Sequence, residues 1–269
     1  MGQTIKDAGR RIDYGERGTV VVVANGDVLA DVAAETLIST IAEAAGEERD
    51  AIVALSGGST PKKMGSLLAA PSYAGRVHWD HVQFFWGDER WVPIADAESN
   101  AGEAFRGFLE KVPVPAENVH PFETDEGTDP EGVADRYERL IREITDTMNP
   151  EETPVFDLIF LGMGDDGHTL SLFPGTVAMH EQDQLVLAHY VPKLDTTRLT
   201  FSPRLANATK TAVFLVGSSG KADMLHTVLD GPIDIDTTPS QVIRPTDGQL
   251  IWLVDVAAAA RLDRTPANG

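Results

Sequence analysis

One stretch decides the expected fold, Phe156-Asp-Leu-Ile-Phe-Leu-Gly-Met-Gly-Asp-Asp-Gly-His168-Thr-Leu-Ser-Leu-Phe-Pro-Gly175. Residues 156–161 are a short apolar run, which predicts a strand buried on both faces, as in parallel sheets. Three glycines within the next six residues allow a sharp turn where that strand ends. Open α/β sheets bind ligands at the carboxyl ends of their strands, so Asp165, Asp166 and His168 become candidate site residues. An imidazole beside carboxylates on such a loop is suited to act as a general base.

The same stretch also spells Gly162-x-Gly164-x-x-Gly167, the fingerprint of dinucleotide binding. A pyrophosphate there would face the carboxylates of Asp165 and Asp166, which oppose the binding of an anion. The pair Pro174-Gly175 also interrupts the long helix that should follow the fingerprint. We therefore favour the general-base interpretation and expect no nucleotide or other cofactor.

Composition excludes several classes of function. The chain has 42 acidic against 22 basic residues, a net charge of −20, which disfavours nucleic acid and anionic membranes as partners. It has no cysteine, which excludes disulfides, thiolate zinc sites and a cysteine nucleophile. No apolar run is long enough to span a membrane, and the N-terminus lacks the features of a signal peptide. We therefore expect a cytoplasmic protein. We also expect no metal site, because His78 and His81 have metal-like spacing but no defined third ligand.

Apolar strands and helical segments alternate along almost the whole chain, which predicts one α/β domain: a mostly parallel twisted sheet with helices on both faces. The domain is placed at residues 18–262, between a polar, poorly ordered N-terminal tail, 1–17, and a C-terminal tail, 263–269. The expected strands are 19–24, 51–55, 82–86, 156–161, 185–190, 197–201, 211–216 and 249–254. The expected helices are 28–45, 62–69, 100–111, 130–148, 221–229 and 256–261.

Three further loops at strand ends carry candidate binding residues. Ser56-Gly57-Gly58-Ser59-Thr60 precedes a helix beginning at Pro61, so its amides and hydroxyls are suited to bind phosphate, although a simple capped turn is the alternative. Gly87-Asp88-Glu89-Arg90 ends an apolar strand, and its arginine offers a planar fork for an anion or stands on a solvated rim. In Gly217-Ser-Ser-Gly220-Lys221 a lysine opposes the dipole of the following helix unless an anion is bound. Arg198 is a weaker candidate for that anion, with a surface role as the alternative.

Taken together, these segments resemble the glucosamine-6-phosphate isomerase/6-phosphogluconolactonase family. The block Trp86–Pro93 is specific to the lactonases, whereas the Ser56–Thr60 and Asp166–His168 blocks are shared with deaminases and ribose-5-phosphate isomerases of the same superfold. Asp165 departs from the pattern, which has proline there in many relatives. The full set of matching blocks, which extends over about residues 18–262, is Leu55–Lys62, Phe85–Pro93, Glu98–Asn100, Leu161–Gly175, Val191–Lys193, Arg198–Thr200 and Gly220–Ala222.

The resemblance implies a Rossmann-like fold of the deaminase/ribose-5-phosphate isomerase type and hydrolysis of 6-phospho-D-glucono-1,5-lactone to 6-phosphogluconate, without metal or cofactor. It implies that His168 takes a proton from water and that Asp166 orients its imidazole. Asp88 and Arg90 would belong to the catalytic group, with Arg90 on the oxyanion or on the phosphate. The implied partner is this small lactone, bound by a monomer or homodimer. The implied substrate-binding residues are Ser56, Gly57, Gly58, Ser59, Thr60, Gly167, Arg198 and Lys221.

Two other functions stay open. A sugar-phosphate isomerase or glucosamine-6-phosphate deaminase would need a base that moves a proton between neighbouring carbons, and the Trp86–Pro93 block favours the lactonase instead. A non-catalytic sugar-phosphate sensor is disfavoured because the acidic chain has neither a helix-turn-helix region nor a basic patch.

Overall fold

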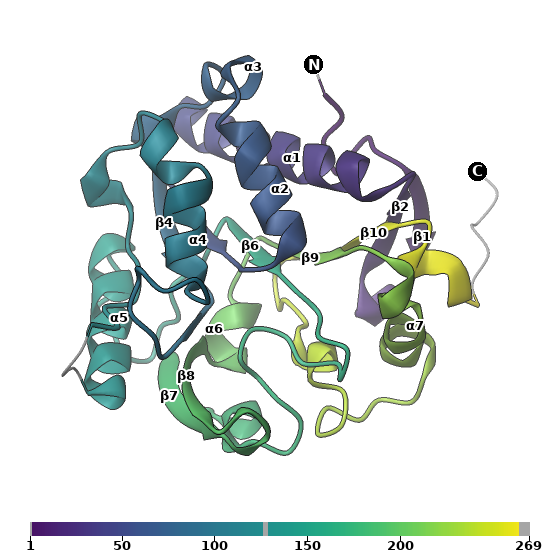
Figure 1. Cartoon of the computed structure of the whole chain (residues 1–269). Helices are drawn as coiled ribbons and strands as arrows, with labels where there is room; N and C mark the ends of the chain where they lie inside the picture. Colours follow the sequence, from purple (N-terminus) through teal and green to yellow (C-terminus); the bar gives the residue numbers. More distant parts are fainter. Residues whose placement is uncertain (1, 126–128, 264–269) are drawn as a thin grey trace.

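The computed structural model describes residues 2–125 and 129–263, and its centre is a seven-stranded sheet in the order β1-β2-β10-β9-β6-β3-β4 (Figure 1). All neighbouring pairs are parallel except β1 with β2. The predicted mostly parallel sheet is thereby confirmed. The strands are β1 (Arg10–Asp13), β2 (Thr19–Val23), β3 (Ala51–Leu55), β4 (Val82–Trp86), β6 (Leu158–Leu161), β9 (Thr211–Val216) and β10 (Gln249–Asp255).

Helices cover both faces of this sheet, as expected: α1 and α2 lie on one side, and α6 and α7 lie on the other (Figure 1). The chain moves one way across the sheet from β2 to β3 to β4, and the opposite way from β6 to β9 to β10. Right-handed crossovers therefore put the two groups of helices on opposite faces. The helices are α1 (Gly26–Gly46), α2 (Ser59–Leu68), α3 (Pro71–Ala74), α4 (Asn100–Gly107), α5 (Pro130–Ile144), α6 (Pro203–Asn207) and α7 (Ala222–Asp230).

The central strands are apolar because both of their faces are covered. Every residue of β6 is buried. Across the neighbouring strands β9 and β10, the rings of Phe214 and Trp252 stack with centroids 3.8 Å apart. This tightly packed centre fixes where each strand ends, and the loops that follow the strands are held in place by it.

A separate antiparallel sheet, in the order β5-β8-β7, was not predicted. Its strands are β5 (Asp88–Arg90), β7 (Val186–Val191) and β8 (Thr196–Phe201). The sequence indicated the last two strands but placed residues 88–90 in a loop. At Gly87 the chain leaves the main sheet, and a Cβ there would lie 2.6 Å from Cδ2 of Leu170. The close packing at Gly87 therefore depends on glycine.

The N-terminal segment is not a poorly ordered tail, so that prediction is wrong. Residues 10–13 form β1, which pairs antiparallel with β2. Ile5, Ala8 and Ile12 are buried in the core. Only one residue of β1, Ile12, is apolar and buried, so the segment has no alternating apolar pattern that would indicate a strand. Met1 and residues 264–269, most of the expected C-terminal tail, lie outside the described residues.

Helix boundaries differ from the predicted ones in several places. α4 ends at Gly107 rather than at Lys111, and a 3-10 turn, Leu109–Lys111, follows it. α2 begins at Ser59 with Gly58 as its N-cap, so Ser59 and Thr60 belong to its first turn. α5 ends at Ile144, which leaves Met148 59 % exposed beyond it. The expected terminal helix is a short 3-10 turn at Ala258–Arg261.

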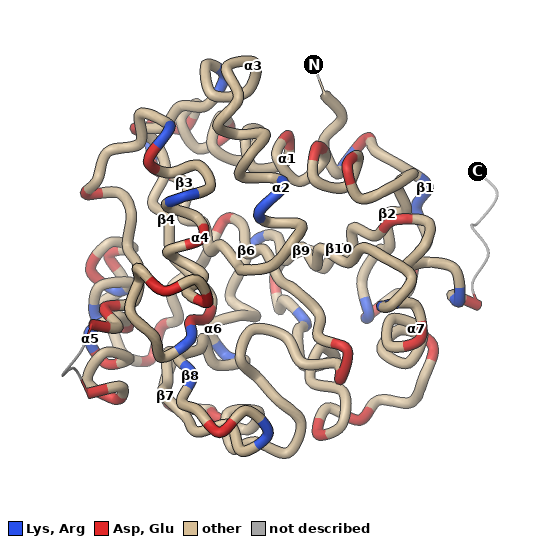
Figure 2. The backbone as a smooth tube through the Cα atoms, in the orientation of Figure 1, with Lys and Arg blue, Asp and Glu red and all other residues tan. Residues whose placement is uncertain are grey.

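Asp and Glu residues occur in segments on all sides of the molecule in the view of Figure 2. Among the described residues, no helix combines the length and the hydropathy needed to span a lipid bilayer.

Candidate active site

The loops that follow β3, β4, β6 and β9 line one cleft of about 540 Å³ at the carboxyl edge of the sheet. The chain reverses its direction across the sheet between β3 and β6, which is where open α/β sheets place their ligands. Of the residues predicted from the sequence, this cleft is lined by Ser56, Gly57, Gly58, Ser59, Thr60, Asp88, Arg90, Asp166, His168, Arg198 and Lys221.

His168 is held by two contacts. Its Nδ1 lies 2.5 Å from Oδ1 of Asp166, and its ring stacks on Phe173 with centroids 4.2 Å apart. Within the described residues its Nε2 has no hydrogen-bond partner, and the side chain is 31 % exposed. A carboxylate at Nδ1 favours the tautomer that carries its proton there, which leaves Nε2 as an acceptor toward the cleft.

The carboxylate of Asp166 pairs with two side chains, His168 and Lys193. Its other oxygen, Oδ2, lies 2.5 Å from Nζ of Lys193, a residue that sequence reasoning left without a role. Burial alone would raise the pKa of Asp166, but the hydrogen bonds from Lys193 and His168 together lower it well below its ordinary value. Asp166 therefore stays ionised and can orient the imidazole at any pH near neutrality.

The turn that carries His168 depends on a close approach at Gly164. A Cβ on Gly164 would lie 2.0 Å from Nδ1 of His168, so a side chain there would displace the imidazole. The turn is closed by a hydrogen bond from the amide of Gly164 to the carbonyl of His168, 2.8 Å, and by one from Oγ1 of Thr169 to the carbonyl of Gly162, also 2.8 Å. The glycines that resemble a nucleotide fingerprint thus serve to position the imidazole of His168.

The N-terminus of α2 faces the cleft, and no side chain of the described residues caps its first amides. Its N-cap, Gly58, provides no side-chain acceptor for the first amides. The hydroxyl of Ser56 is buried and has no hydrogen-bond partner in the described part of the chain. Gly57 packs against Asn100, whose Oδ1 would lie 1.8 Å from a Cβ at that position. Free amides, a free hydroxyl and the helix dipole make this end of the cleft suited to an anion.

Arg90 and Arg198 form one wall of the cleft. They are directly paired in the register of β5 and β8, so their side chains leave the same face of the small sheet. Nη1 of Arg90 donates to the carbonyl of Glu98. Burial, followed by the charge of Arg90, lowers the pKa of Arg198 from its ordinary value. Two neighbouring cations in a partly buried cleft repel each other, and a bound anion that contacts both relieves this repulsion.

A layer of buried acceptors supports this wall. Oδ2 of Asp88 accepts from Oγ of Ser171 at 2.8 Å, and Glu89 is fully buried. The carboxylate of Glu89 accepts from the amides of Asn100 and Ala101, 2.8 and 2.9 Å, at the start of α4. Burial raises the pKa of Glu89, an effect that these amides oppose. Glu89 therefore fixes the α4 terminus behind the cleft, whereas Asp88 reaches the cleft itself.

Gly167 differs from what the sequence suggested, and Lys221 makes a contact that the sequence did not indicate. Gly167 has a φ of +77° and does not line the cleft; its carbonyl accepts from the amide and hydroxyl of Ser240, at 2.8 and 2.7 Å. It therefore shapes the loop from behind. Lys221 does line the cleft, and its Nζ lies 2.5 Å from Oδ1 of Asp165.

Three polar side chains that line the cleft had no predicted role: Asn100, Ser171 and Lys193. Asn100 and Lys193 lie in segments that carried the family resemblance, so that resemblance was the available signal for them. Ser171 also lies in a matching segment, Leu161–Gly175, but its contact with Asp88, 83 residues away in the chain, could not be predicted from the local sequence.

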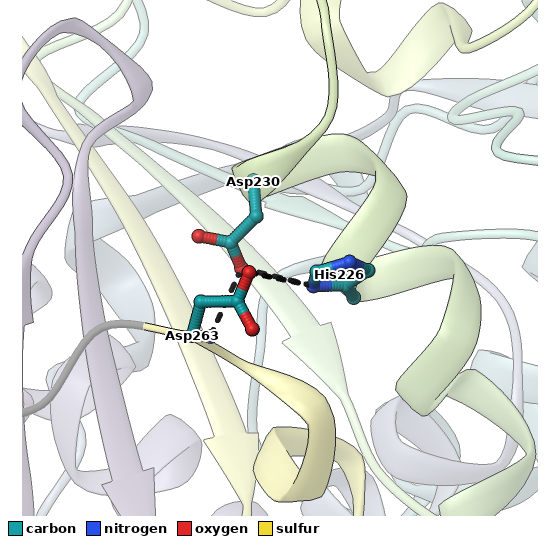
Figure 3. A group of neighbouring side chains, drawn as sticks. All are labelled: His226, Asp230 and Asp263. Carbon is teal, nitrogen blue, oxygen red and sulfur yellow. Dashed lines mark hydrogen bonds and ion pairs between the residues drawn. The ribbon is translucent and has the colours of Figure 1, made fainter.

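A separate cluster lies outside the cleft, at the end of α7. His226, Asp230 and Asp263 have potential ligand atoms within 4.8 Å of one another, and their side chains converge from α7 and the C-terminal segment (Figure 3). Nδ1 of His226 lies 3.3 Å from Asp230 and 3.9 Å from Asp263. The side chain of Asp263 is 73 % exposed. The amide of Asp263 also donates to Oδ2 of Asp230 at 3.3 Å, so the cluster ties the C-terminal segment to α7. His78 and His81 are not part of it.

A base paired with a carboxylate, facing a helix terminus and several cations, is the arrangement of an enzyme that acts on an anionic small molecule. Residues 24–252 match the family described as glucosamine-6-phosphate isomerases/6-phosphogluconolactonase, and the chain belongs to this family.

Relatives and solved structures agree with this assignment. The 6-phosphogluconolactonase of Synechocystis sp. is 36 % identical over 243 residues, which cover 90 % of this chain and 98 % of that protein. The crystal structure of the devB protein has a TM-score of 0.81 at 33 % identity, covering 90 % of this chain and 98 % of that one. The 6-phosphogluconolactonase from Trypanosoma cruzi has a TM-score of 0.79 at 26 % identity, with coverages of 94 % and 99 %. The predicted fold class is confirmed.

Proposed function

We propose that this protein is an enzyme that hydrolyses 6-phospho-D-glucono-1,5-lactone to 6-phosphogluconate, a step of the oxidative pentose phosphate pathway. The names of the relatives support the substrate. The observation that carries the proposal is the pairing of His168 with Asp166 at 2.5 Å, in the same cleft as an anion-binding helix terminus. The pair provides a general base, and the helix terminus provides a binding site for the phosphate of the same substrate.

In this mechanism Nε2 of His168 takes a proton from a water molecule as its oxygen attacks the lactone carbonyl. The tetrahedral intermediate then collapses, and the bond from the former carbonyl carbon to the ring oxygen breaks. The imidazolium returns the proton to that ring oxygen, which becomes the 5-hydroxyl of the product. A lactone is an activated ester, so a general base with correct positioning is sufficient for the reaction.

The phosphate is assigned to the end of the cleft formed by Ser56–Thr60, Lys221 and Arg198. The first amides of α2 and the free hydroxyl of Ser56 provide donors, and the two cations provide charge. Arg90, beside Arg198 in the register, is assigned to the oxygen that becomes negative in the transition state. Asp88 holds Ser171 on the same wall.

The decisive test measures acid release from freshly prepared 6-phosphogluconolactone, corrected for its spontaneous opening. We expect turnover far above that background, and its absence would refute the proposal. Incubation with glucosamine 6-phosphate, with an assay for ammonia, tests the deaminase named in the same family. A sugar-phosphate sensor would bind 6-phosphogluconate without hydrolysing the lactone.

We further propose that the enzyme acts in the cytoplasm as a monomer or homodimer. Light scattering coupled to size-exclusion chromatography measures the assembly, and a larger oligomer would contradict this part of the proposal.

A further inference from the structure

The ammonium of Lys221, assigned above to the phosphate, already has a partner from its own chain. Lys221 ends the 3-10 turn Ser219–Lys221, immediately before α7. Its Nζ lies 2.5 Å from Oδ1 of Asp165, which reaches it from the loop after β6. Both residues line the cleft, and Lys221 has no other salt bridge within the described residues. A carboxylate therefore occupies one of the cationic positions that the phosphate needs.

Asp165 is held there by this ion pair alone. Its side chain is 84 % exposed, and in the described part of the chain it makes no side-chain hydrogen bond except the one with Lys221. The neighbouring carboxylate of Asp166 repels it. An exposed single ion pair is weak, and a carboxylate that rotates into water regains its hydration. Asp165 can therefore leave Lys221 without disturbing the fold.

We propose that Asp165 is a built-in competitor for the anion site at Lys221 and that it sets the affinity and charge selectivity of that site. This inference rests on the phosphate site of the proposed function and adds to it a residue that opposes binding. In the unliganded protein Asp165 neutralises Lys221; when the phosphate enters, Asp165 is displaced into solvent.

The competition favours ligands that carry two negative charges. A neutral hydroxyl cannot replace the charge of Asp165, and a singly charged group replaces it with no net gain in Coulomb energy. A phosphate dianion brings a second charge and further acceptor oxygens, which the amides of α2 can bind. Asp165 thus selects for a phosphorylated substrate by raising the threshold that every ligand must exceed.

The test compares Asp165→Asn with the unaltered protein, using inorganic phosphate as the probe in titration calorimetry. We expect the Kd for phosphate to fall roughly two- to fivefold, the range of an exposed ion pair. In the lactonase assay KM should fall by a similar factor, with a smaller change in kcat. The matched control is Asp80→Asn, which removes the same charge from an exposed side chain beside the start of β4, at the opposite edge of the sheet. This control should leave phosphate binding unchanged.

A double-mutant cycle with Lys221→Ala separates the alternatives. If Asp165 acts through Lys221, Asp165→Asn has no effect on the Kd once Lys221 is absent. If Asp165→Asn lowers the Kd for phosphate equally with and without Lys221, the inference is overturned, because the substitution would then act through the overall electrostatic potential of the cleft. Weaker binding in Asp165→Asn would overturn it too, because Asp165 would then position Lys221 rather than compete for it.

Failure of the proposed function is distinguishable from failure of this inference. Phosphate binding that tightens in Asp165→Asn, without turnover of the lactone by either protein, would refute the enzyme and leave the competition intact. A Kd that does not change, or phosphate binding absent from both proteins, would refute the competition whatever the enzyme does.

Discussion

Asp165 and Asp166 are neighbours in the chain, and each pairs with one lysine of the cleft, yet the structure gives them opposite surroundings. The side chain of Asp166 is 22 % exposed and is shared between Lys193 and His168. The side chain of Asp165 is 84 % exposed and pairs with Lys221. A carboxylate with two partners and little contact with water holds both partners in a fixed geometry. An exposed carboxylate easily exchanges its single partner for water. The difference in exposure to solvent suits Asp166 to orienting the imidazole of His168 and suits Asp165 to the proposed competition for the anion site.

The largest expected effect comes from removing the base that Asp166 orients. His168→Ala should lower kcat by about 10² to 10⁴, the usual contribution of a general base, with little change in KM. Steady-state kinetics on the lactone measure both constants. The matched control is His180→Ala, since His180 also pairs with an aspartate, Asp236, but is 61 % exposed and does not line the cleft. Near-normal turnover by His168→Ala would remove His168 from the mechanism.

The two aspartates should then differ in kcat when each is changed to asparagine. Asp166→Asn should lower kcat by on the order of 10², because an amide can donate to Nδ1 and stabilise the wrong tautomer. Asp165→Asn should act mainly on KM. Comparable kcat values for the two variants would break the comparison, since they would show that Asp166 does not orient the imidazole.

The two lysines provide the next comparison. Lys221→Ala should raise KM about tenfold with little change in kcat, since it removes one charge-assisted hydrogen bond to the phosphate. Lys193→Ala should act mainly on kcat, because Lys193 holds Asp166 and through it His168. An unchanged KM in Lys221→Ala would exclude Lys221 from the phosphate site. A selective effect of Lys193→Ala on KM would move Lys193 into that site.

The smallest effect concerns stability in acid. The folded pKa of Asp166 lies below its ordinary value, so its carboxylate stabilises the fold above the unfolded pKa of about 4. This contribution is lost as the pH falls through the lower, folded pKa. Asp166→Asn should therefore be less stable than the unaltered protein at about pH 7, with a difference that shrinks below about pH 4. Urea unfolding across this range measures it, and a difference independent of pH would contradict the assignment. The exposed Asp165 should show little difference at any pH.

Much of the site could be predicted because its loops follow strands that are legible in the sequence. The apolar runs before Ser56, Gly87 and Gly162 indicated parallel strands, and parallel strands end at one edge of a sheet. The residues after them had to meet there, and the structure brings them into one cleft. Gly167 was wrongly predicted to contact the substrate because it lies in a loop of the site. Its positive φ serves the turn of that loop instead.

Other features depended on contacts that no local pattern records. The pairing of β5 with β8, which sets Arg90 beside Arg198, joins segments about a hundred residues apart. The N-terminal strand β1 was hidden because an edge strand needs few apolar residues. The link from Lys193 to Asp166 spans 27 residues and depends on how the small sheet packs over the cleft.

The sequence by itself determined the class of fold and indicated the candidate base and the loops that line the cleft, because hydrophobic periodicity and glycine turns are local properties of the chain. Only the tertiary structure decided which carboxylate serves which cation. Burial and distance set the strength of every charge pair, and both depend on segments that meet only in the folded protein.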